Sequence, residues 1–436
     1  MKKTILFVVA ESKSANGVCC HAVMRCLKSD YNVLCLTNRE WGGKESYIVD
    51  GIPYFTITPR FVTRLNERVR TSVDGTLKQH VLKLLFFGIN KLKLIISVFT
   101  WPWLSPKYTN RFYEKMENLY DMYCIDCVVP VYKQIDPLIA AKRLKRKLNK
   151  AGKDIQVIPY FLDPLSGGIG PKMFSEEMMV KRGQEWEKRV LDVADTVIVM
   201  ESSRTNHEKN NKDQAYYDKL VYMDIPLLNL ESIDQENCIA TNENRKVDVN
   251  LASEKGTEDI RVFYGGTLHE PMRNVTRMIA LISRVKNPRI HFVFAGYGAR
   301  QEIFANKKNI EFLGELSHEK VREQLNEADV LLNMGVTRST AISGKIFEYM
   351  TTGKPIVSTF SIDKEACIPY LNKYPLAFMV DEREQDLDKQ ATELESFIIE
   401  NLMKTVPREY IRETFKKNMP ETTAEYLRKA MEEYGV

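Results

Sequence analysis

A short stretch around residue 345 combines residue types that can hold a phosphate group. Ser343 and Gly344 precede a run with helical apolar spacing, and Lys345 stands in its predicted first turn. The free N–H groups at the start of a helix, together with the helix dipole, attract anions. Gly344 has no Cβ, so a phosphate could approach its backbone closely. The stretch therefore predicts an anion site, with the carboxylate of Glu348 one turn further along.

Glycine turns elsewhere in the C-terminal half offer further places where a phosphate could lie. Arg273 stands at the start of a predicted helix that follows an apolar run and a glycine turn. Another apolar run ends in a G-x-G. The residues of these turns are Gly265, Gly266 and Thr267 in the first, and Gly296 and Gly298 in the second. A strand, a glycine turn and a helix in this order are typical of nucleotide-binding α/β domains.

These turns belong to an alternating series of short apolar runs and helical stretches. The predicted strands cover residues 260–264, 290–294, 310–313, 330–333 and 355–358. The predicted helices cover about 273–286, 297–306, 317–327 and 343–352, and the end of the chain also reads as helices. Such alternation predicts a parallel sheet covered by helices. The carboxyl edge of the sheet is where these folds bind ligands.

The N-terminal half repeats this architecture without repeating its sequence. Its predicted strands cover residues 3–10, 31–37, 125–131, 155–162, 196–200 and 221–225. Gly17 lies in the loop after the first strand, and Asp163 follows the fourth. Both positions fall at the predicted carboxyl edge, so they are candidates for lining a ligand site. A plain turn is the alternative for each, because glycine and Asp-Pro both favour turns.

The residues from Ile342 to Val357 resemble the donor-site motif of glycosyltransferase family four, the retaining enzymes of GT-B fold. That motif has two glutamates, and the second opens the pattern E-x-M-x-x-G-x-P-[IV]-V. The pattern is matched here by Glu348, Met350, Gly353, Pro355, Ile356 and Val357. The resemblance implies that Glu348 accepts hydrogen bonds from the ribose hydroxyls of a nucleotide. The first glutamate is replaced by Thr340, so the sequence departs from the family at its usual sugar-hydroxyl contact.

The glycine turn near Arg273 looks like the family element whose two basic residues hold the diphosphate. Arg273 matches the second basic position, Thr267 stands at the first, and Lys345 is expected to supply the missing charge. The resemblance covers about residues 258–360. It implies catalytic roles for Arg273, Lys345 and, on the acceptor side, Asp163. Contacts with the donor or the cleft are implied for Gly17, Gly265, Gly266, Thr267, Gly296, Gly298, Ser343, Gly344 and Glu348.

The implied fold is GT-B, an α/β architecture of two Rossmann-like, doubly wound domains that face a central cleft. We expect an acceptor-binding domain over residues 1–225, a polar linker over 226–258 and a nucleotide-sugar domain over 259–407. The helices of about 408–436 are expected to pack back on the first domain. A length of 436 residues also suits two domains, because a single hydrophobic core ordinarily serves a shorter chain.

The implied function is that of a retaining, metal-independent hexosyltransferase. It would move a sugar from a UDP- or GDP-sugar donor to a glycan or lipid-linked glycan acceptor, as in surface polysaccharide or capsule biosynthesis. The six histidines show no metal spacing, so no metal and no cofactor besides the donor is expected. Two alternatives stay open. One is a nucleotide-sugar 2-epimerase of related fold, and the other is a non-catalytic binding subunit of a glycan assembly complex.

A basic and apolar segment stands apart from this scheme. Residues 51–150 hold 18 basic and 7 acidic residues, and residues 81–104 combine lysines with long apolar runs, Trp101 and Trp103. One interpretation is a core helix whose lysines reach solvent. The other is an interfacial segment that contacts an anionic membrane. The interleaved apolar runs argue against nucleic acid as the partner.

The chain is expected in the cytoplasm, at most peripheral at the inner membrane face. The apolar run 3–10 ends at Glu11 without a small-residue cleavage site, which argues against a signal peptide. Most of the eight cysteines lie in apolar stretches, as free thiols do in a reducing compartment. Cys124 and Cys127 form a C-x-x-C, but no second pair completes a zinc site.

Overall fold

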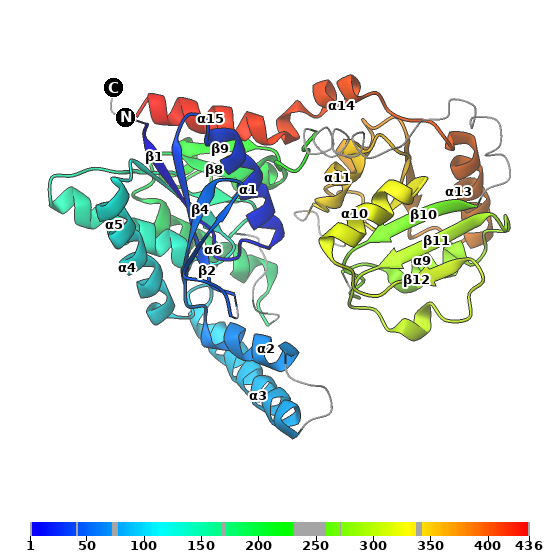
Figure 1. Cartoon of the computed structure of the whole chain (residues 1–436), viewed down its shortest axis with the longest axis horizontal. Coiled ribbons are helices and arrows are strands. Elements are labelled where there is room, and N and C mark those ends of the chain that lie inside the picture. The colour runs from blue at the N-terminus through cyan, green and yellow to red at the C-terminus, as the bar shows by residue number, and fades with distance from the viewer. Residues whose placement is uncertain are drawn as a thin grey trace. The chain divides into compact units, whose positions relative to one another are not determined.

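The computed structural model describes residues 2–40, 42–71, 77–166, 171, 173–230, 259–270, 272–336 and 342–434. Over these residues the chain forms two α/β units (Figure 1). The N-terminal unit comprises Met1–Pro226 and Pro420–Val436, and the C-terminal unit comprises Leu227–Met419. Most of the predicted linker, from residue 231 to 258, lies outside the described residues.

The N-terminal unit is built on a sheet that is parallel except at one edge. Its order is β3 (Ser46–Val49), β4 (Ile52–Ile57), β2 (Asn32–Asn38), β1 (Thr4–Val8), β5 (Cys127–Tyr132), β7 (Tyr160–Phe161), β8 (Val197–Met200) and β9 (Leu220–Met223), with β6 (Gln156–Val157) paired to β5. Only β3 and β4 pair antiparallel among these strands. Every residue of β1 is buried, as expected for a strand covered on both faces.

Helices enclose this sheet and bring the end of the chain back to it. They are α1 (Ala15–Leu27), α4 (Pro106–Tyr123), α5 (Asp136–Lys150), α6 (Glu176–Leu191), α7 (Arg204–Asn210) and α15 (Pro420–Glu432). In one core cluster, Phe112 of α4 and Leu144 of α5 pack with Leu6 of β1. The last helix, α15, packs on α1. The return to the N-terminal unit therefore begins at Pro420, whereas residue 408 belongs to the C-terminal unit.

The C-terminal unit has a fully parallel sheet. Its order is β12 (Ile310–Phe312), β11 (Ile290–Ala295), β10 (Ile260–Gly265), β13 (Val330–Asn333), β14 (Ile356–Phe360) and β15 (Ala377–Asp381). Its helices are α9 (Val275–Ile282), α10 (His318–Glu327), α11 (Lys345–Thr351), α12 (Ile368–Leu371), α13 (Leu387–Asn401) and α14 (Arg408–Thr414). The core gathers side chains of β10, β11, β13, α9 and α13. The predicted doubly wound α/β architecture is confirmed.

One predicted helix is wrong. Residues 297–306 contain only the 3-10 turn Gln301–Ile303 where the sequence predicted a full helix. Gly296 and Gly298 have φ angles of 145° and 108°, a backbone conformation that glycine adopts readily and that no helix contains. The chain therefore forms an irregular loop after β11. Strands β3, β4 and β15 were not predicted.

Two helices, α2 (Phe61–Thr71) and α3 (Leu77–Thr100), lie between β4 and α4 and pack on each other. They extend away from the sheet of the N-terminal unit (Figure 1). The interpretation of residues 81–104 as a core helix is wrong, because most of the large apolar side chains of α3 are exposed. No described helix is both long enough and apolar enough to cross a membrane.

The tryptophans that follow α3 attach it to the unit. Trp101 is 9% exposed and packs edge-on against Phe174, with ring centroids 6.2 Å apart. The indole N–H of Trp103 donates to Thr109 Oγ1 at 2.8 Å. Trp101 is thus buried, and Trp103 is partly buried against the same core cluster.

Candidate functional site

Loops from three strands meet at the carboxyl edge of the C-terminal sheet. The loop after β10 and the loop after β11 are hydrogen bonded to each other, because Leu268 N–H donates to Tyr297 O at 2.7 Å. Gly266 N–H donates to Ala295 O at 2.7 Å. Lys345, the first residue of α11, lies against Gly266 of the first loop. The fold thus brings together the glycine turns and the start of α11, that is, Gly265, Gly266, Thr267, Gly296, Gly298, Lys345 and Glu348.

The glycines of these loops allow close packing between them. A Cβ on Gly296 would lie 1.7 Å from Gly266 O, and a Cβ on Gly298 would lie 3.1 Å from His269 Cα. Gly265 N–H donates to the Tyr349 hydroxyl at 3.4 Å. Thr267 accepts a hydrogen bond at its carbonyl from Tyr264 at 2.6 Å. The glycines therefore shape the loops. Their predicted contacts with the nucleotide-sugar donor stay a prediction.

Lys345 begins α11 and lies across the loop after β10. A Cβ on Gly266 would be 2.1 Å from both Cε and Nζ of Lys345, so a side chain at this position would displace the end of the lysine. The ammonium lies 5.7 Å from the centroid of the Tyr264 ring. Burial and, to a smaller extent, the charge of Arg273 lower the pKa of Lys345 to about 8, while the charge of Glu348 opposes the shift. A neighbouring anion would favour the charged form of this amine.

Arg273 is buried at the same edge. It is 7% exposed, and its guanidinium donates to the carbonyl of Met334, just after β13. Its charge acts on Lys345, Tyr264 and Tyr349. The guanidinium has five N–H donors in a fixed plane. Arg273 and Lys345 therefore concentrate positive charge where the loops of β10 and β13 meet.

Ser343 lies inside the edge and holds the start of α11 in place. It is 4% exposed, and its hydroxyl donates to Asn333 Oδ1 at 2.9 Å. Its N–H donates to Cys367 Sγ at 3.3 Å. Asn333 in turn donates to Ser358 Oγ at 2.8 Å. The hydroxyl and N–H of Ser343 are thus used within the protein.

Gly344 directly precedes Lys345 in the sequence, and Glu348 follows it by three residues. A Cβ on Gly344 would lie 2.5 Å from Leu227 Cδ1, so this glycine makes room for a side chain of the same unit. Glu348 is exposed on α11, one turn from Lys345. Thr340 lies outside the described residues. The role of Glu348 at a ribose stays a prediction.

Glu365, which sequence reasoning missed, adds a buried carboxylate to this edge. It is 1% exposed, and its Oε2 accepts from Cys367 N–H at 3.2 Å. Its Oε1 has no hydrogen-bond partner within the described part of the chain. Burial raises the pKa of Glu365, while hydrogen bonds from Cys367 and Val336 and the charge of Arg273 lower it. No local motif marks this residue, because its surroundings come from distant loops.

The carboxyl edge of the N-terminal sheet carries a different cluster. Asp163 follows β7 and is exposed, and its Oδ2 accepts from Asn16 Nδ2 at 3.0 Å. A Cβ on Gly17 would lie 2.1 Å from Ser12 O, so the start of α1 packs tightly on the preceding loop. Lys133, after β5, pairs with Glu11, after β1, at 2.6 Å. The sequence analysis did not identify Glu11, Asn16 or Lys133 as site residues, because they lie in polar loops that show no recognisable motif.

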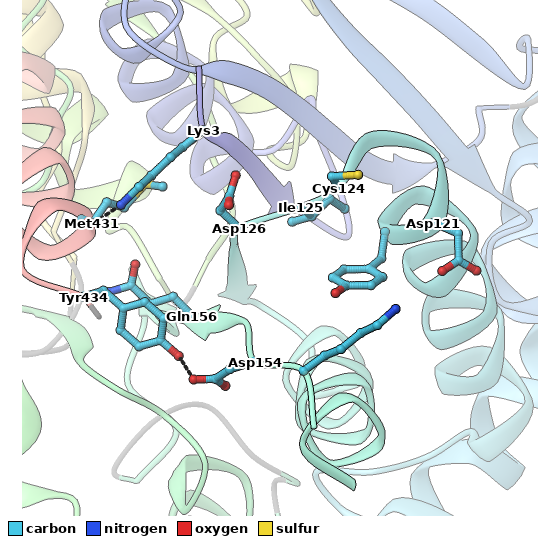
Figure 2. Close-up of a pocket in the computed structure, with 11 residues that line it drawn as sticks. Lys3, Asp121, Cys124, Ile125, Asp126, Asp154, Gln156, Met431 and Tyr434 are labelled. Carbon is cyan, nitrogen blue, oxygen red and sulfur yellow. Dashed lines mark hydrogen bonds between the residues drawn. The ribbon is translucent and has the colours of Figure 1, made fainter. Parts of the chain in front are cut away.

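A cavity of about 450 Å³ lies at the opposite, amino edge of the N-terminal sheet. Lys3 points toward Met431 there, and Tyr434 donates to Asp154 at 2.5 Å (Figure 2). Its lining lacks Gly17 and Asp163. Across the described segments, no cluster of three His, Cys, Asp or Glu side chains is arranged to hold a metal ion. The cavity therefore lies apart from the residues predicted to bind ligand.

The C-terminal unit matches a known family in sequence. Residues 259–392 match the model of a family described as glycosyl transferases group 1. This segment contains Arg273 and Lys345. No curated protein sequence matches the chain.

Solved structures of similar fold extend over the whole chain. A glycosyltransferase from Rickettsia africae has 12% identity and a TM-score of 0.58, covering 99% of this chain and 98% of that chain. Sucrose-phosphate synthase from Thermosynechococcus elongatus has 11% identity and a TM-score of 0.56, with coverages of 100% and 98%. UDP-GlcNAc 2-epimerase from Neisseria meningitidis, bound to UDP-GlcNAc, has 9% identity and a TM-score of 0.50, with coverages of 99% and 99%. These likenesses confirm the predicted GT-B fold.

Proposed function

We propose that this protein transfers a hexosyl group from a nucleoside diphosphate sugar to a hydroxyl of a glycan acceptor. The observation that carries the proposal is the pairing of buried Arg273 with Lys345 at the carboxyl edge of the C-terminal sheet. Both lie in the segment that matches glycosyl transferases group 1. A diphosphate is the ligand that two such cations suit best.

The chemistry needs stabilisation of the leaving group. Cleavage of the bond between the sugar and the phosphate leaves negative charge on a UDP or GDP diphosphate. Arg273 and Lys345 would meet that charge from two different loops, without a metal ion or a further cofactor. Glu348 would accept from the ribose hydroxyls. We propose retention of the anomeric configuration, as the family resemblance implies.

The acceptor side is proposed to lie at the N-terminal cluster. The Asp163 carboxylate is exposed and held by Asn16, so it can accept a hydrogen bond from an acceptor hydroxyl. A glycan or lipid-linked glycan has many such hydroxyls. We place the reaction in surface polysaccharide or capsule biosynthesis, at the cytoplasmic side of the membrane.

The proposal is tested with the Arg273→Ala variant. Because one donor aimed at developing charge contributes about 3 kcal/mol, turnover should fall by roughly 100-fold or more. The measurement is release of UDP or GDP from a panel of nucleotide sugars in the presence of glycan acceptors. Arg284→Ala is the matched control, since Arg284 lies on the surface two residues after α9, with its side chain 41% exposed. Equal rates in the two variants would refute the site.

The same assay separates two alternatives. A 2-epimerase would convert the nucleotide sugar to its epimer without any acceptor. A binding subunit would show nucleotide-dependent thermal stabilisation but no transfer and no epimer. Product that contains the added sugar, formed only with acceptor present, supports transfer over both.

A further inference from the structure

The long helix α3 presents large apolar side chains to solvent along most of its length. It has 24 residues, which corresponds to about 36 Å at the α-helical rise. The six most exposed apolar side chains are between 57% and 74% exposed, and they are Leu84, Phe87, Leu92, Leu94, Ile95 and Phe99. Single exposed apolar residues are ordinary, but a continuous patch of this kind marks a surface that contacts something else.

These six side chains share one face of α3. At 100° per residue they fall within roughly 160° of the helix circumference. The opposite face is the one that packs in the protein: Gln79 is 4% and Ser97 is 8% exposed there, and α2 contacts α3. The apolar face is therefore the outward one, which is the reverse of a helix that covers a soluble core.

Basic residues accompany the apolar face. Lys83 and Lys91 are exposed on α3, and the Lys91 ammonium lies 4.5 Å from the centroid of the Phe87 ring. Residues 60–100 contain eight basic and two acidic residues, a net charge of +6. An apolar face together with basic residues is the pattern of a helix that lies in the plane of an anionic membrane surface.

The same mixture continues onto α6 at the C-terminal end of α3. Phe99 and Met178 line one cavity of about 640 Å³, together with the basic residues Lys181 and Arg189. Met178 is 53% exposed. Arg182 of α6 donates to the carbonyls of Val98, at 3.1 Å, and of Phe99. These hydrogen bonds fix the C-terminal end of α3 to α6, so the helix that carries the outward face is held in place.

We propose that the outward face of α3 is a docking surface for an anionic lipid bilayer. The apolar side chains enter the headgroup boundary, and Lys83 and Lys91 contact lipid phosphates. A second copy of the chain is the poorer occupant, because two such faces would bring segments of +6 charge together. This membrane contact goes beyond the proposed transfer reaction and does not depend on it.

The experiment is co-sedimentation of the full chain with vesicles of phosphatidylcholine, with or without phosphatidylglycerol. The wild type should bind the anionic vesicles, and high salt should weaken the binding. Leu84→Glu/Ile95→Glu should lower the vesicle affinity by about 100-fold or more, because each buried leucine or isoleucine contributes at least about tenfold. Lys83→Ala/Lys91→Ala should lower the affinity for anionic vesicles alone, by about fivefold per lysine.

The matched control is Ile48→Glu/Met122→Glu. Ile48 and Met122 are 72% and 60% exposed on other elements of the same unit, so this variant has the same charge change and should bind like the wild type. Thermal unfolding of all variants checks that they fold. The proposal is overturned if wild type ignores anionic vesicles, binds neutral ones equally, or binds no better than the Leu84/Ile95 variant. It is also overturned if sedimentation velocity shows a stable dimer that this variant dissociates.

None of these readouts requires a nucleotide sugar. Failure of vesicle binding would leave the transfer assay untouched, and failure of transfer would leave vesicle binding untouched. The two proposals can therefore fail separately.

Discussion

The two sheets of this protein carry opposite kinds of polar residue at the same structural position. At the carboxyl edge of the C-terminal sheet, Arg273 and Lys345 lie close enough for the charge of Arg273 to lower the pKa of Lys345. At the carboxyl edge of the N-terminal sheet, charges are paired or hydrogen bonded, as in Glu11 with Lys133 and Asp163 with Asn16. The first arrangement suits a dianionic ligand, and the second suits a neutral ligand rich in hydroxyls.

The difference teaches that fold alone does not assign the sites. Both edges come from parallel strands, and both are places where such sheets bind ligands. The balance of charge separates them, since a buried cation is costly without an anion nearby. If the assignment is right, variants at the two edges should affect donor and acceptor separately.

The largest effect is expected for Lys345→Ala. The leaving diphosphate would lose one of its two cations, so turnover should fall by roughly 100-fold or more. The measurement is steady-state transfer at saturating donor and acceptor. Lys373→Ala serves as control, because Lys373 is an exposed lysine of the same unit. A Lys345→Ala enzyme as active as this control would remove Lys345 from the reaction.

The affinity for a nucleoside diphosphate should depend on pH through the same residue. Lys345 in the free protein has a pKa of about 8, so it is charged below that pH and neutral above it. Binding of UDP or GDP should therefore weaken as pH rises, roughly tenfold per pH unit above about 8. Calorimetric titration across this range measures the slope. Lys345→Arg keeps its charge at every pH and should bind with a flat profile; a slope shared by both proteins would point to another group.

The strands and the residues of the cationic edge could be predicted from the sequence, because each is marked by a short, local pattern. Buried parallel strands such as β1 and β10 are continuous apolar runs, which stand out in any sequence. Arg273, Lys345 and Glu348 lie in short stretches that follow one another along the chain in the same order as the family motifs that they resemble. Their meeting at one edge follows from the alternation of strand and helix.

The remainder depends on contacts between distant segments. Glu365 is buried by loops that follow β13 and β14, so no spacing announces it. Residues 297–306 have helix-forming residues, but the left-handed backbone at Gly298 excludes a helix. The apolar run of α3 suggests burial, and only the three-dimensional structure shows that its apolar face points outward.

At the N-terminal edge, Asp163→Asn should act on the acceptor. The variant retains an oxygen for Asn16 but loses the charge, and a hydrogen bond to a charged group contributes about 1.5–3 kcal/mol. The acceptor KM should rise about tenfold or more, while the donor KM stays the same. Asp192→Asn, on a surface ion pair with Lys142 in the same unit, is the control. A changed donor KM would show that Asp163 lies at the donor instead.

The smallest effect is expected in stability, from Glu365→Gln. The carboxylate is buried with Oε1 unpaired among the described residues, and burial raises its pKa. A neutral amide avoids that desolvation and can still accept from Cys367, so the variant should be more stable at neutral pH by about 1 kcal/mol, or roughly 2–4 °C in Tm. Because an acid with a raised folded-state pKa loses its penalty on protonation, the gap should close as pH falls toward the ordinary value near 4.5. Thermal unfolding at neutral and acidic pH measures this against Glu393→Gln, an exposed change on α13. If Glu365→Gln instead destabilises the protein at neutral pH, the attraction of Arg273 outweighs the burial, and the carboxylate belongs to the charge balance of the cationic edge.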